Sequence, residues 1–237
     1  MSKIAYVFDV DGTLTPSRLT MKKKFQEFFL KWMKGKNIFF ITGSDKDKTI
    51  EQVGSQIWSR TTSNLQSCGN NIWEGDEEVH RLEWSPNAEL ITRLRAILNE
   101  SKYPIRTSNH IEERIGLVNF SIVGRGCTQE QRDAYYEWDT KEGERLRISQ
   151  ALMKQFPQLE ASVGGQISID IHPKGCNKSQ AKKWILDKLG EDTTIYFYGD
   201  KTLKGGNDYD LAKILESPHR VFPVKDWNDT MNLLLKI

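Results

Sequence analysis

Two apolar segments at opposite ends of the chain each run directly into an aspartate. The segment IAYVF, residues 4–8, is followed by Asp9, and TTIYFYG, in 193–200, is followed by Asp200. Continuous apolar runs of this length are typical of parallel strands, which are buried on both faces of a sheet. The carboxyl ends of such strands converge on one crevice, where ligands bind. We therefore expect Asp9, Asp11 and Asp200 to lie close together.

The segments around these strands alternate between strand and helix. Residues 19–35 have the apolar spacing of a helix, 37–45 contain a second apolar strand, and Asp45 is placed to cap the helix that follows. Near the other end, a helix is expected over 178–189, and a short strand over 220–224 precedes a closing helix. This alternation predicts an α/β fold with a doubly wound, Rossmann-like parallel sheet.

The middle of the chain has a different pattern. Helices are predicted over 86–100 and 128–156, and Gly143 interrupts the second. Residues 116–124 and 159–173 alternate apolar with polar side chains, which is typical of a sheet with one solvated face. The two patterns predict two units: a catalytic core formed by residues 1–80 and 177–237, and an inserted α+β cap domain formed by residues 81–176.

Composition and charge exclude several kinds of partner. The 237 residues carry a net charge of +2, which gives no bulk attraction to nucleic acid or to an anionic membrane. No apolar run approaches the roughly 20 residues that a membrane span needs. Cys68, Cys127 and Cys176 are odd in number and widely spaced, so a disulfide framework is not expected and a reducing cytoplasm is the predicted location.

The aspartates at the strand ends point to phosphoryl transfer. Carboxylates held close together repel one another, and a hard divalent cation such as Mg²⁺ removes the conflict. Asp9 is the candidate nucleophile, because an aspartate can accept a phosphoryl group covalently. Asp11 lies two residues further on and is the candidate acid and base for the sugar oxygen. The alternative is that Asp9 and Asp11 only shape a turn.

Five polar residues near the other strand ends complete the predicted core site. Thr42 has a hydroxyl suited to a phosphoryl oxygen, and Ser44 is its rival. Lys178 opens a helix and would offset the charge of the nucleophile, although a solvated surface lysine is the alternative. Asn207 and Asp208 either hold water on the metal or orient Lys178. The loop that contains them lacks the G-K-[ST] of a Walker motif, which disfavours nucleotide triphosphate binding.

The predicted cap contains candidate phosphate and sugar contacts. Arg114, Arg125 and Arg132 cluster around one predicted strand, and arginine suits a planar, multidentate grip on phosphate. Opposite a metal site they would hold the distal phosphate of a bisphosphate; a solvated basic rim is the alternative. Ser168 and Asp170 have the same strand parity, so both face one side and are candidates for binding sugar hydroxyls.

Four segments, in order, resemble the motifs of the haloacid dehalogenase superfamily: DVDGT, ITGSD, Lys178 and GDKTLKGGND. The resemblance is closer to one branch, the eukaryotic-type α-phosphomannomutases. That branch has FDVDGTLT followed closely by an arginine, here Arg18. It also has cap segments similar to RIGLVNFSIVGRGCTQEQR (114–132) and GGQISIDIHPKGCNKSQA (164–181). The resemblance spans nearly the whole chain.

The resemblance implies a role for each matching residue. Asp9 is the nucleophile, Asp11 the acid and base, and Mg²⁺ binds to Asp9, Asp200 and the carbonyl of Asp11. The substrate contacts that it implies are Arg18, Arg114, Asn119, Arg125, Arg132, Ser168 and Asp170. It also implies a hexose 1,6-bisphosphate activator and a homodimer formed through the cap.

The motifs of the core leave the reaction open. A mutase would interconvert hexose 6-phosphate and hexose 1-phosphate, with mannose as the expected hexose. A sugar-phosphate phosphatase would form the same phosphorylated Asp9, and water would then hydrolyse it. The cap arginines favour the mutase, because a phosphatase needs to bind only one phosphate. A catalytically idle binding protein is disfavoured, since binding alone does not require the nucleophile and the acid together.

Overall fold

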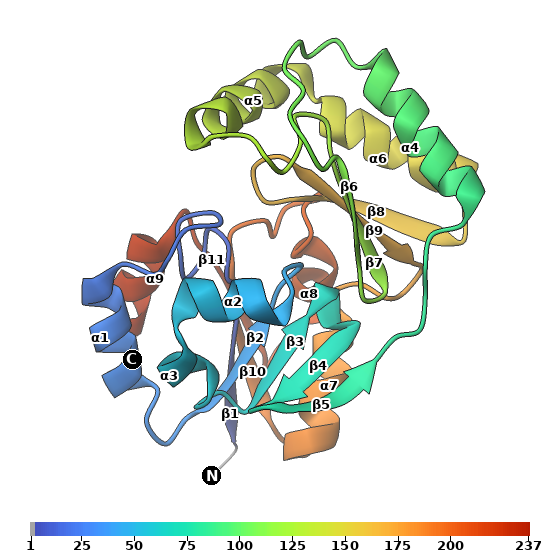
Figure 1. Cartoon of the computed structure of the whole chain (residues 1–237). Helices are drawn as coiled ribbons and strands as arrows, with labels where there is room; N and C mark the ends of the chain where they lie inside the picture. The colour runs from blue at the N-terminus through green and yellow to red at the C-terminus, as the bar shows by residue number, and fades with distance from the viewer. Residues whose placement is uncertain (1–2) are drawn as a thin grey trace.

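The computed structural model describes residues 3–237, which form a seven-stranded and a four-stranded sheet (Figure 1). The strands of the first sheet are β1 (Ile4–Phe8), β2 (Asn37–Ile41), β3 (Ser63–Gln66), β4 (Asn71–Glu74), β5 (Glu77–Arg81), β10 (Thr194–Gly199) and β11 (Arg220–Pro223). Their order is β11-β10-β1-β2-β3-β4-β5, and the first five of these pair in parallel. The predicted α/β fold with a parallel sheet is confirmed.

The helices of this unit cover both faces of the sheet (Figure 1). They are α1 (Lys23–Trp32), α2 (Lys46–Val53), α3 (Ser55–Trp58), α7 (Gln180–Leu189), α8 (Tyr209–Ile214) and α9 (Trp227–Leu234). Alternate residues of β1 serve the two faces: Phe8 packs in one cluster with Phe29 of α1, whereas Val7 packs in another with Ile185 of α7. Asp45 caps α2 as predicted, its side chain accepting a hydrogen bond from the Lys48 amide.

Strands β3, β4 and β5 extend the sheet with antiparallel pairings that the sequence did not predict. Strand β3 consists of Ser63, Asn64, Leu65 and Gln66, and all four are buried. Three of these four side chains are polar, so the segment lacks the apolar run by which β1, β2 and β10 were predicted. Its polar side chains bond to nearby protein groups instead. Ser63 donates to Oε1 of Glu74 at 3.0 Å and Nδ2 of Asn64 to Oγ1 of Thr61 at 2.6 Å, whereas Oδ1 of Asn64 has no partner within residues 3–237.

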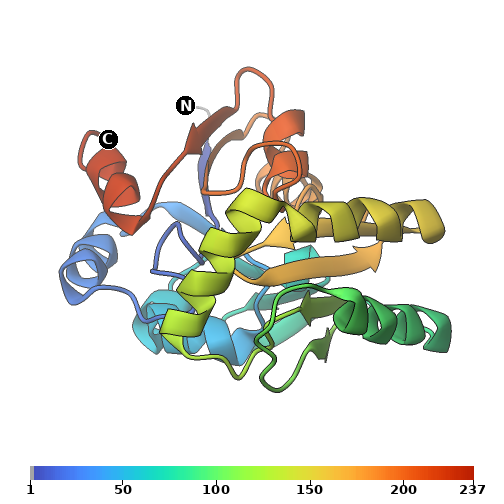
Figure 2. The same cartoon turned by 90° about the horizontal axis from the view of Figure 1, so that it is seen from above.

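The second sheet is antiparallel and lies between the core sheet and three helices (Figures 1 and 2). Its strands are β6 (Ile111–Arg114), β7 (Leu117–Ser121), β8 (Leu159–Gly164) and β9 (Ser168–Pro173), and its helices are α4 (Ala88–Glu100), α5 (Gln129–Glu142) and α6 (Glu144–Gln155). The predicted break between the last two helices is present, because Gly143 adopts φ 66° and ends α5. Figure 2 looks down on the cap helices, which lie on the far side of this sheet from the core.

The predicted solvated face of β7 is wrong. Val118 and Phe120 pack against the apolar cluster of the cap helices, and Asn119 and Ser121, on the opposite face, are 3 % and 1 % exposed. That face turns toward the carboxyl ends of the core strands, so polar side chains are buried in a site instead of hydrated. Alternating polarity indicates that one face of a strand is apolar and the other polar. It does not show whether the polar face contacts water or lines a polar site inside the protein.

We propose the domain boundaries predicted from the sequence, with residues 1–80 and 177–237 as the core and 81–176 as the cap, and these names are used below. Residues 1–2 of that division lie outside the described part. The apolar cluster of the cap shares no residue with the two clusters on the core sheet. No helix within 3–237 is long and apolar enough to cross a membrane.

Candidate active site

The core part of the site is an acidic cluster at adjacent strand ends. Strands β1 and β10 pair in parallel register, so Asp9 and Asp200, which follow them, emerge at one edge of the sheet. Asp208 reaches the same point from the loop before α8. Each of these three aspartates offers an oxygen atom that lies within 4.8 Å of the other two. Of the three aspartates predicted to lie close together, Asp9 and Asp200, 191 positions apart in the chain numbering, are in this cluster. Asp11 lines the same pocket, but its side chain is not part of the cluster.

The electrostatics of this cluster favour a bound cation. Burial, followed by the Asp208 carboxylate, raises the pKa of Asp200 to about 7. Burial also raises the pKa of Asp9, and repulsion from Asp208 and Asp200 adds to that rise. A carboxylate in this state holds a proton unless a positive charge replaces it. Oxygen ligands from aspartates are the set that Mg²⁺ takes in proteins, so the residues present fit that ion.

Lys178 is part of the cluster, and the alternative of a solvated surface lysine is wrong. Its side chain is 0 % exposed, and Nζ donates hydrogen bonds to Oδ1 of Asp9 at 2.6 Å and to Oδ1 of Asp208 at 2.7 Å. Burial alone would favour the neutral amine, but the carboxylates of Asp208 and Asp9 raise the pKa of Lys178 above its ordinary value. The lysine therefore lies in the site as a cation.

The loop before α8 holds Lys178 in place through Asp208. The second oxygen of Asp208 accepts a hydrogen bond from the Lys201 amide at 2.9 Å, while the first holds Lys178. This geometry favours the alternative in which Asp208 orients the lysine. Asn207 lines the pocket, and its buried Oδ1 atom has no hydrogen-bond partner within residues 3–237. An unpartnered buried acceptor is available to a metal-bound water or a substrate hydroxyl.

Asp11 lines the same pocket, and three donors fix its side chain. Oδ1 accepts from the Arg18 amide at 2.5 Å and from Nε2 of Gln52 at 2.9 Å, and Oδ2 lies 3.5 Å from Oγ of Ser44. Gln52 was not predicted as a site residue. It lies in α2, is 1 % exposed and also donates to Thr15 Oγ1, and nothing in its local sequence distinguishes it from a surface glutamine.

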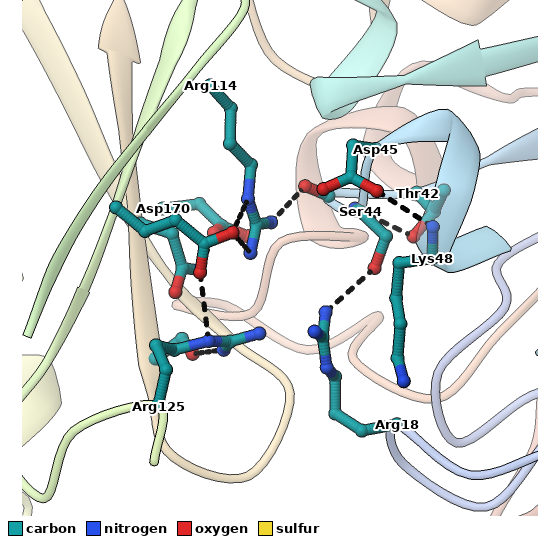
Figure 3. A network of polar contacts seen from close by, with 12 residues as sticks. Arg18, Thr42, Ser44, Asp45, Lys48, Arg114, Arg125 and Asp170 are labelled. Carbon is teal, nitrogen blue, oxygen red and sulfur yellow. Dashed lines mark hydrogen bonds and ion pairs between the residues drawn. The ribbon is translucent and has the colours of Figure 1, made fainter. Parts of the chain in front are cut away.

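Thr42 and Ser44 flank Gly43 in the turn that follows β2, and both line the pocket (Figure 3). The amide of Ser44 donates to Oγ1 of Thr42 at 3.1 Å, so the two side chains share one tight turn. Oγ of Ser44 accepts from Nη1 of Arg18 at 3.5 Å. The structure therefore brings both candidate phosphoryl ligands into the pocket.

The opposite wall of the pocket carries positive charge, and a solvated basic rim is the wrong description of it. Arg114 and Arg125 have side chains that are 5 % and 9 % exposed, and Arg132 is 6 % exposed. All three line the pocket from the cap, and Arg18 lines it from the core. Figure 3 shows Arg114 and Arg125 on one side of the opening, across from Arg18 and Ser44.

The remaining predicted cap residues also converge here. Asn119 and Asp170 are directly opposite on β7 and β9, and Nδ2 of the first donates to Oδ1 of the second at 2.7 Å. Oγ of Ser168 accepts from Nη1 of Arg125 at 2.8 Å. Gly43 of the core lies so near Asp170 that a Cβ atom there would stand 2.8 Å from Oδ2. The cap side chains therefore reach the motif turns of the core.

Glu112 is a second residue that the sequence did not identify. It lies in β6 and contacts two of the arginines, with 2.9 Å between Oε1 and Nε of Arg114 and 3.1 Å between Oε2 and Nε of Arg125. Glu113 and Arg114 follow it in the sequence, and the three together are typical of an ordinary charged strand surface. Only the position of Arg125, brought in by another loop, marks Glu112 as part of the site.

The fold and the site together define a class. Solved structures with the same arrangement include an N-terminal truncated IMP-nucleotidase from Plasmodium falciparum, with a TM-score of 0.66 at 14 % identity, covering 99 % of this chain and 70 % of that one. A haloacid dehalogenase-like hydrolase from Bacteroides thetaiotaomicron has a TM-score of 0.59 at 13 % identity and covers 99 % of both chains. The chain has the haloacid dehalogenase-like fold.

Sequence comparison gives the family. The model of the eukaryotic phosphomannomutase family matches residues 25–237. The Saccharomyces cerevisiae phosphomannomutase is 34 % identical over 86 % of this chain and 83 % of its own, and the Drosophila melanogaster phosphomannomutase is 32 % identical over 99 % and 96 %. The chain belongs to the eukaryotic phosphomannomutase family. The predicted superfamily, branch and enzyme class are confirmed.

Proposed function

We propose that this protein interconverts hexose 6-phosphate and hexose 1-phosphate, with mannose as the preferred hexose, through a phosphoaspartyl intermediate at Asp9. One observation carries the proposal: an acidic end of the pocket, which would take a phosphoryl group together with a cation, faces a second end that is rich in arginine. Carboxylates with a buried lysine form the core end, and Arg114, Arg125 and Arg132 lie in the cap wall. A mutase must hold both phosphates of its bisphosphate intermediate, whereas a phosphatase needs to hold one.

Asp9, Asp200 and the main-chain carbonyl of Asp11 would hold Mg²⁺, with Asn207 and Asp208 close by. The raised pKa of Asp200 supports this assignment, since burial and the Asp208 carboxylate keep that group protonated near neutral pH unless a cation binds; Asp9 has Lys178 as a positive neighbour in addition. When bound, the ion would neutralise charge on the phosphoryl group during its transfer.

The chain's own residues supply the rest of the chemistry. A carboxylate oxygen of Asp9 attacks phosphorus, the bond from phosphorus to the sugar oxygen breaks, and that oxygen takes a proton from Asp11. Lys178 orients Asp9 and offsets its charge. The hydroxyls of Thr42 and Ser44 donate to oxygens of the transferred group. In a turnover of a sugar monophosphate the attack by Asp9 comes second. In the first step Asp11 accepts the proton of the sugar hydroxyl that attacks the phosphoaspartate, the bond from phosphorus to the Asp9 oxygen breaks, and the sugar bisphosphate forms.

The cap holds the substrate and keeps water away from the phosphoaspartate. In this proposal Arg18, Arg114, Arg125 and Arg132 bind the phosphate that is not being transferred, and Asn119, Ser168 and Asp170 bind sugar hydroxyls. Apart from Arg18, which is half-buried, these side chains are buried, and this supports the proposal because electrostatic contacts gain strength when water is excluded. The sugar bisphosphate turns around between the two halves, so the arginines must accept either phosphate.

The activator, the assembly and the location complete the proposal. Hexose 1,6-bisphosphate would restore the phosphoaspartate whenever water removes it. We also infer a homodimer formed through the cap, on the family resemblance, and a cytoplasmic location, which the free state of Cys68, Cys127 and Cys176 supports. Sedimentation of the full chain and of a variant with charged substitutions on the cap helices tests the dimer.

The test of the reaction is a coupled assay. Mannose 1-phosphate is supplied with a catalytic amount of glucose 1,6-bisphosphate, and both mannose 6-phosphate and free phosphate are measured. The mutase should give mannose 6-phosphate with little free phosphate. Free phosphate as the main product, with no 6-phosphate, would instead establish the second candidate, a sugar-phosphate phosphatase that uses the same Asp9 intermediate. A panel of hexose phosphates in the same assay identifies the preferred sugar.

A further inference from the structure

The carboxylate of Glu112 joins two arginines that come from different parts of the cap. Oε1 accepts a hydrogen bond from Nε of Arg114 at 2.9 Å, and Oε2 lies 3.1 Å from Nε of Arg125. Arg114 ends β6, the strand that contains Glu112, whereas Arg125 lies in the loop after β7. One carboxylate therefore fixes two guanidinium groups relative to each other, with one oxygen for each.

The positive charges around the pocket make such a partner necessary. Burial, followed by repulsion from Arg18 and Arg114, lowers the pKa of Arg125 to about 10, and Glu112 acts in the opposite direction. Without a counter-charge, neighbouring guanidinium groups of this kind move apart. Glu112 is not among the residues that line the pocket within 3–237, and its side chain is 23 % exposed. It therefore contacts the arginines on the side that faces away from the pocket.

Both arginines keep donors for a ligand on the pocket side. Nε and Nη2 of Arg114 face Glu112, whereas Nη1 points toward the core and donates to the carbonyl of Gly43, a residue that lines the pocket; the second N–H of Nη1 is left for a ligand. Nη1 of Arg125 donates to Oγ of Ser168, a hydroxyl that also lines the pocket. Guanidinium groups bind phosphate through several parallel N–H bonds, and this requires the plane of each group to be fixed.

We propose that Glu112 is a positioning residue for substrate phosphate: it holds Arg114 and Arg125 side by side so that their remaining N–H groups meet the phosphate that is not being transferred. The inference rests on the proposed function, because it takes the ligand at this wall to be a sugar phosphate. It gives a negatively charged residue, Glu112, a role in the arginine-rich wall that binds the negatively charged phosphate.

Two effects of Glu112 oppose each other, and the structure decides between them. Its negative charge by itself weakens the attraction of the wall for phosphate. Its two contacts, however, hold two long side chains that would otherwise lose their alignment and repel each other. Because Glu112 lies behind the arginines and is partly exposed, solvent screens its charge while both short contacts remain. Positioning therefore prevails, and loss of the carboxylate weakens phosphate binding.

The chain offers a matched control for this test. Glu113 is the next residue of β6, is exposed, and by strand parity faces the opposite side. Glu112→Gln and Glu113→Gln remove the same charge from the same strand, but only the first removes the partner of the arginines. Each variant is compared with the unaltered chain for the KM of mannose 1-phosphate. Hydrolysis of acetyl phosphate, a donor with no sugar and no second phosphate, measures the core chemistry alone.

We expect Glu112→Gln to raise the KM for mannose 1-phosphate about tenfold, which is the loss of one well-oriented ionic contact. The rate of acetyl phosphate hydrolysis should stay within about twofold of that of the unaltered chain. This small donor has no second phosphate, so it does not depend on the contact with the cap arginines that the substitution weakens. Glu113→Gln should change neither quantity. An unchanged or lowered KM in Glu112→Gln would overturn the proposal, as would an equal fall in acetyl phosphate hydrolysis.

A double-mutant cycle adds an independent readout. Arg125→Ala removes one of the two groups that Glu112 holds, so Glu112→Gln should cost less in that background than in the unaltered chain. Full additivity of the two substitutions would contradict the proposed coupling. The test also separates two failures: if the enzyme releases free phosphate instead of isomerised sugar, the proposed function fails, while the KM for sugar phosphate hydrolysis still reports on Glu112.

Discussion

The side-chain amine of Lys178 lies 2.6 Å from Oδ1 of Asp9, although the two residues are 169 positions apart in the chain. The same amine donates to Asp208 at 2.7 Å, and both the lysine and Asp208 are completely buried. Charges taken out of water at this depth are costly unless each has a partner. The core of the site is therefore held together by a chain of opposite charges, and its chemistry depends on all of them.

Replacing Lys178 with methionine should abolish most activity and destabilise the fold. The substitution leaves Asp9 and Asp208 as buried carboxylates without their cation, for which a cost of about 3–5 kcal/mol in the free energy of unfolding is expected. The kcat should fall by about 10²–10³-fold, as on loss of a charged stabilising group. Chemical denaturation and the coupled assay measure the two effects. Lys183→Met, whose side chain is 81 % exposed, should leave both quantities unchanged.

Replacing Asp9 with asparagine should abolish mutase turnover and acetyl phosphate hydrolysis together. The amide keeps the shape of the side chain but cannot serve as the attacking carboxylate. Incubation with a ³²P-labelled bisphosphate should label the unaltered chain and leave the variant unlabelled. Turnover retained at more than a trace level in Asp9→Asn would rule out the covalent route.

Replacing Gln52 with leucine should lower kcat with little change in KM. Gln52 donates one of the hydrogen bonds that fix Oδ1 of Asp11, and leucine has a similar volume but no donor. Misplacing a general acid costs about 10²-fold in kcat. Gln56→Leu, at an exposed position, serves as the control, and equal effects of the two substitutions would refute the role given to Gln52.

Magnesium should stabilise the protein more at neutral and alkaline pH than in acid. Burial and Asp208 raise the pKa of Asp200 from 3.8 to about 7, so the metal-free folded chain binds a proton there more tightly than the unfolded chain does. The stability that this proton contributes is complete below about pH 4 and is lost as the pH rises to about 7. Mg²⁺ replaces the proton, and its stabilisation grows over the same range.

The measurement is the thermal midpoint Tm with and without Mg²⁺ at about pH 5 and about pH 8. At about 100 times its Kd the ion should contribute about 2.7 kcal/mol at the higher pH. Asp200→Asn removes both the titration and a ligand, so its Tm should respond little to Mg²⁺ at either pH. A shift of equal size at both pH values in the unaltered chain would contradict the assignment of Asp200 as a ligand.

Local pattern was enough to predict most elements of the fold. The apolar runs that end at Asp9 and Asp200 predicted two parallel strands, and the change to alternating polarity predicted a second sheet. The polar strand β3 and the buried polar face of β7 escaped prediction. In both, polar side chains bond to other protein groups, as Ser63 does to Glu74 and Asn119 to Asp170, and a polar side chain looks the same in sequence whether its partner is water or protein.

The sequence by itself determined the kind of chemistry and the residues of its motifs, because the carboxyl ends of parallel strands must meet at one edge of a sheet. Only the tertiary structure decided which groups surround those residues. It buried Lys178 between two aspartates, brought Gln52 to Asp11 and placed Arg125 against Glu112. The spacing of apolar residues predicts which residues a few positions apart lie on the same face of a helix or strand. The contacts named above instead join segments that are distant in the sequence, and they depend on how the chain packs.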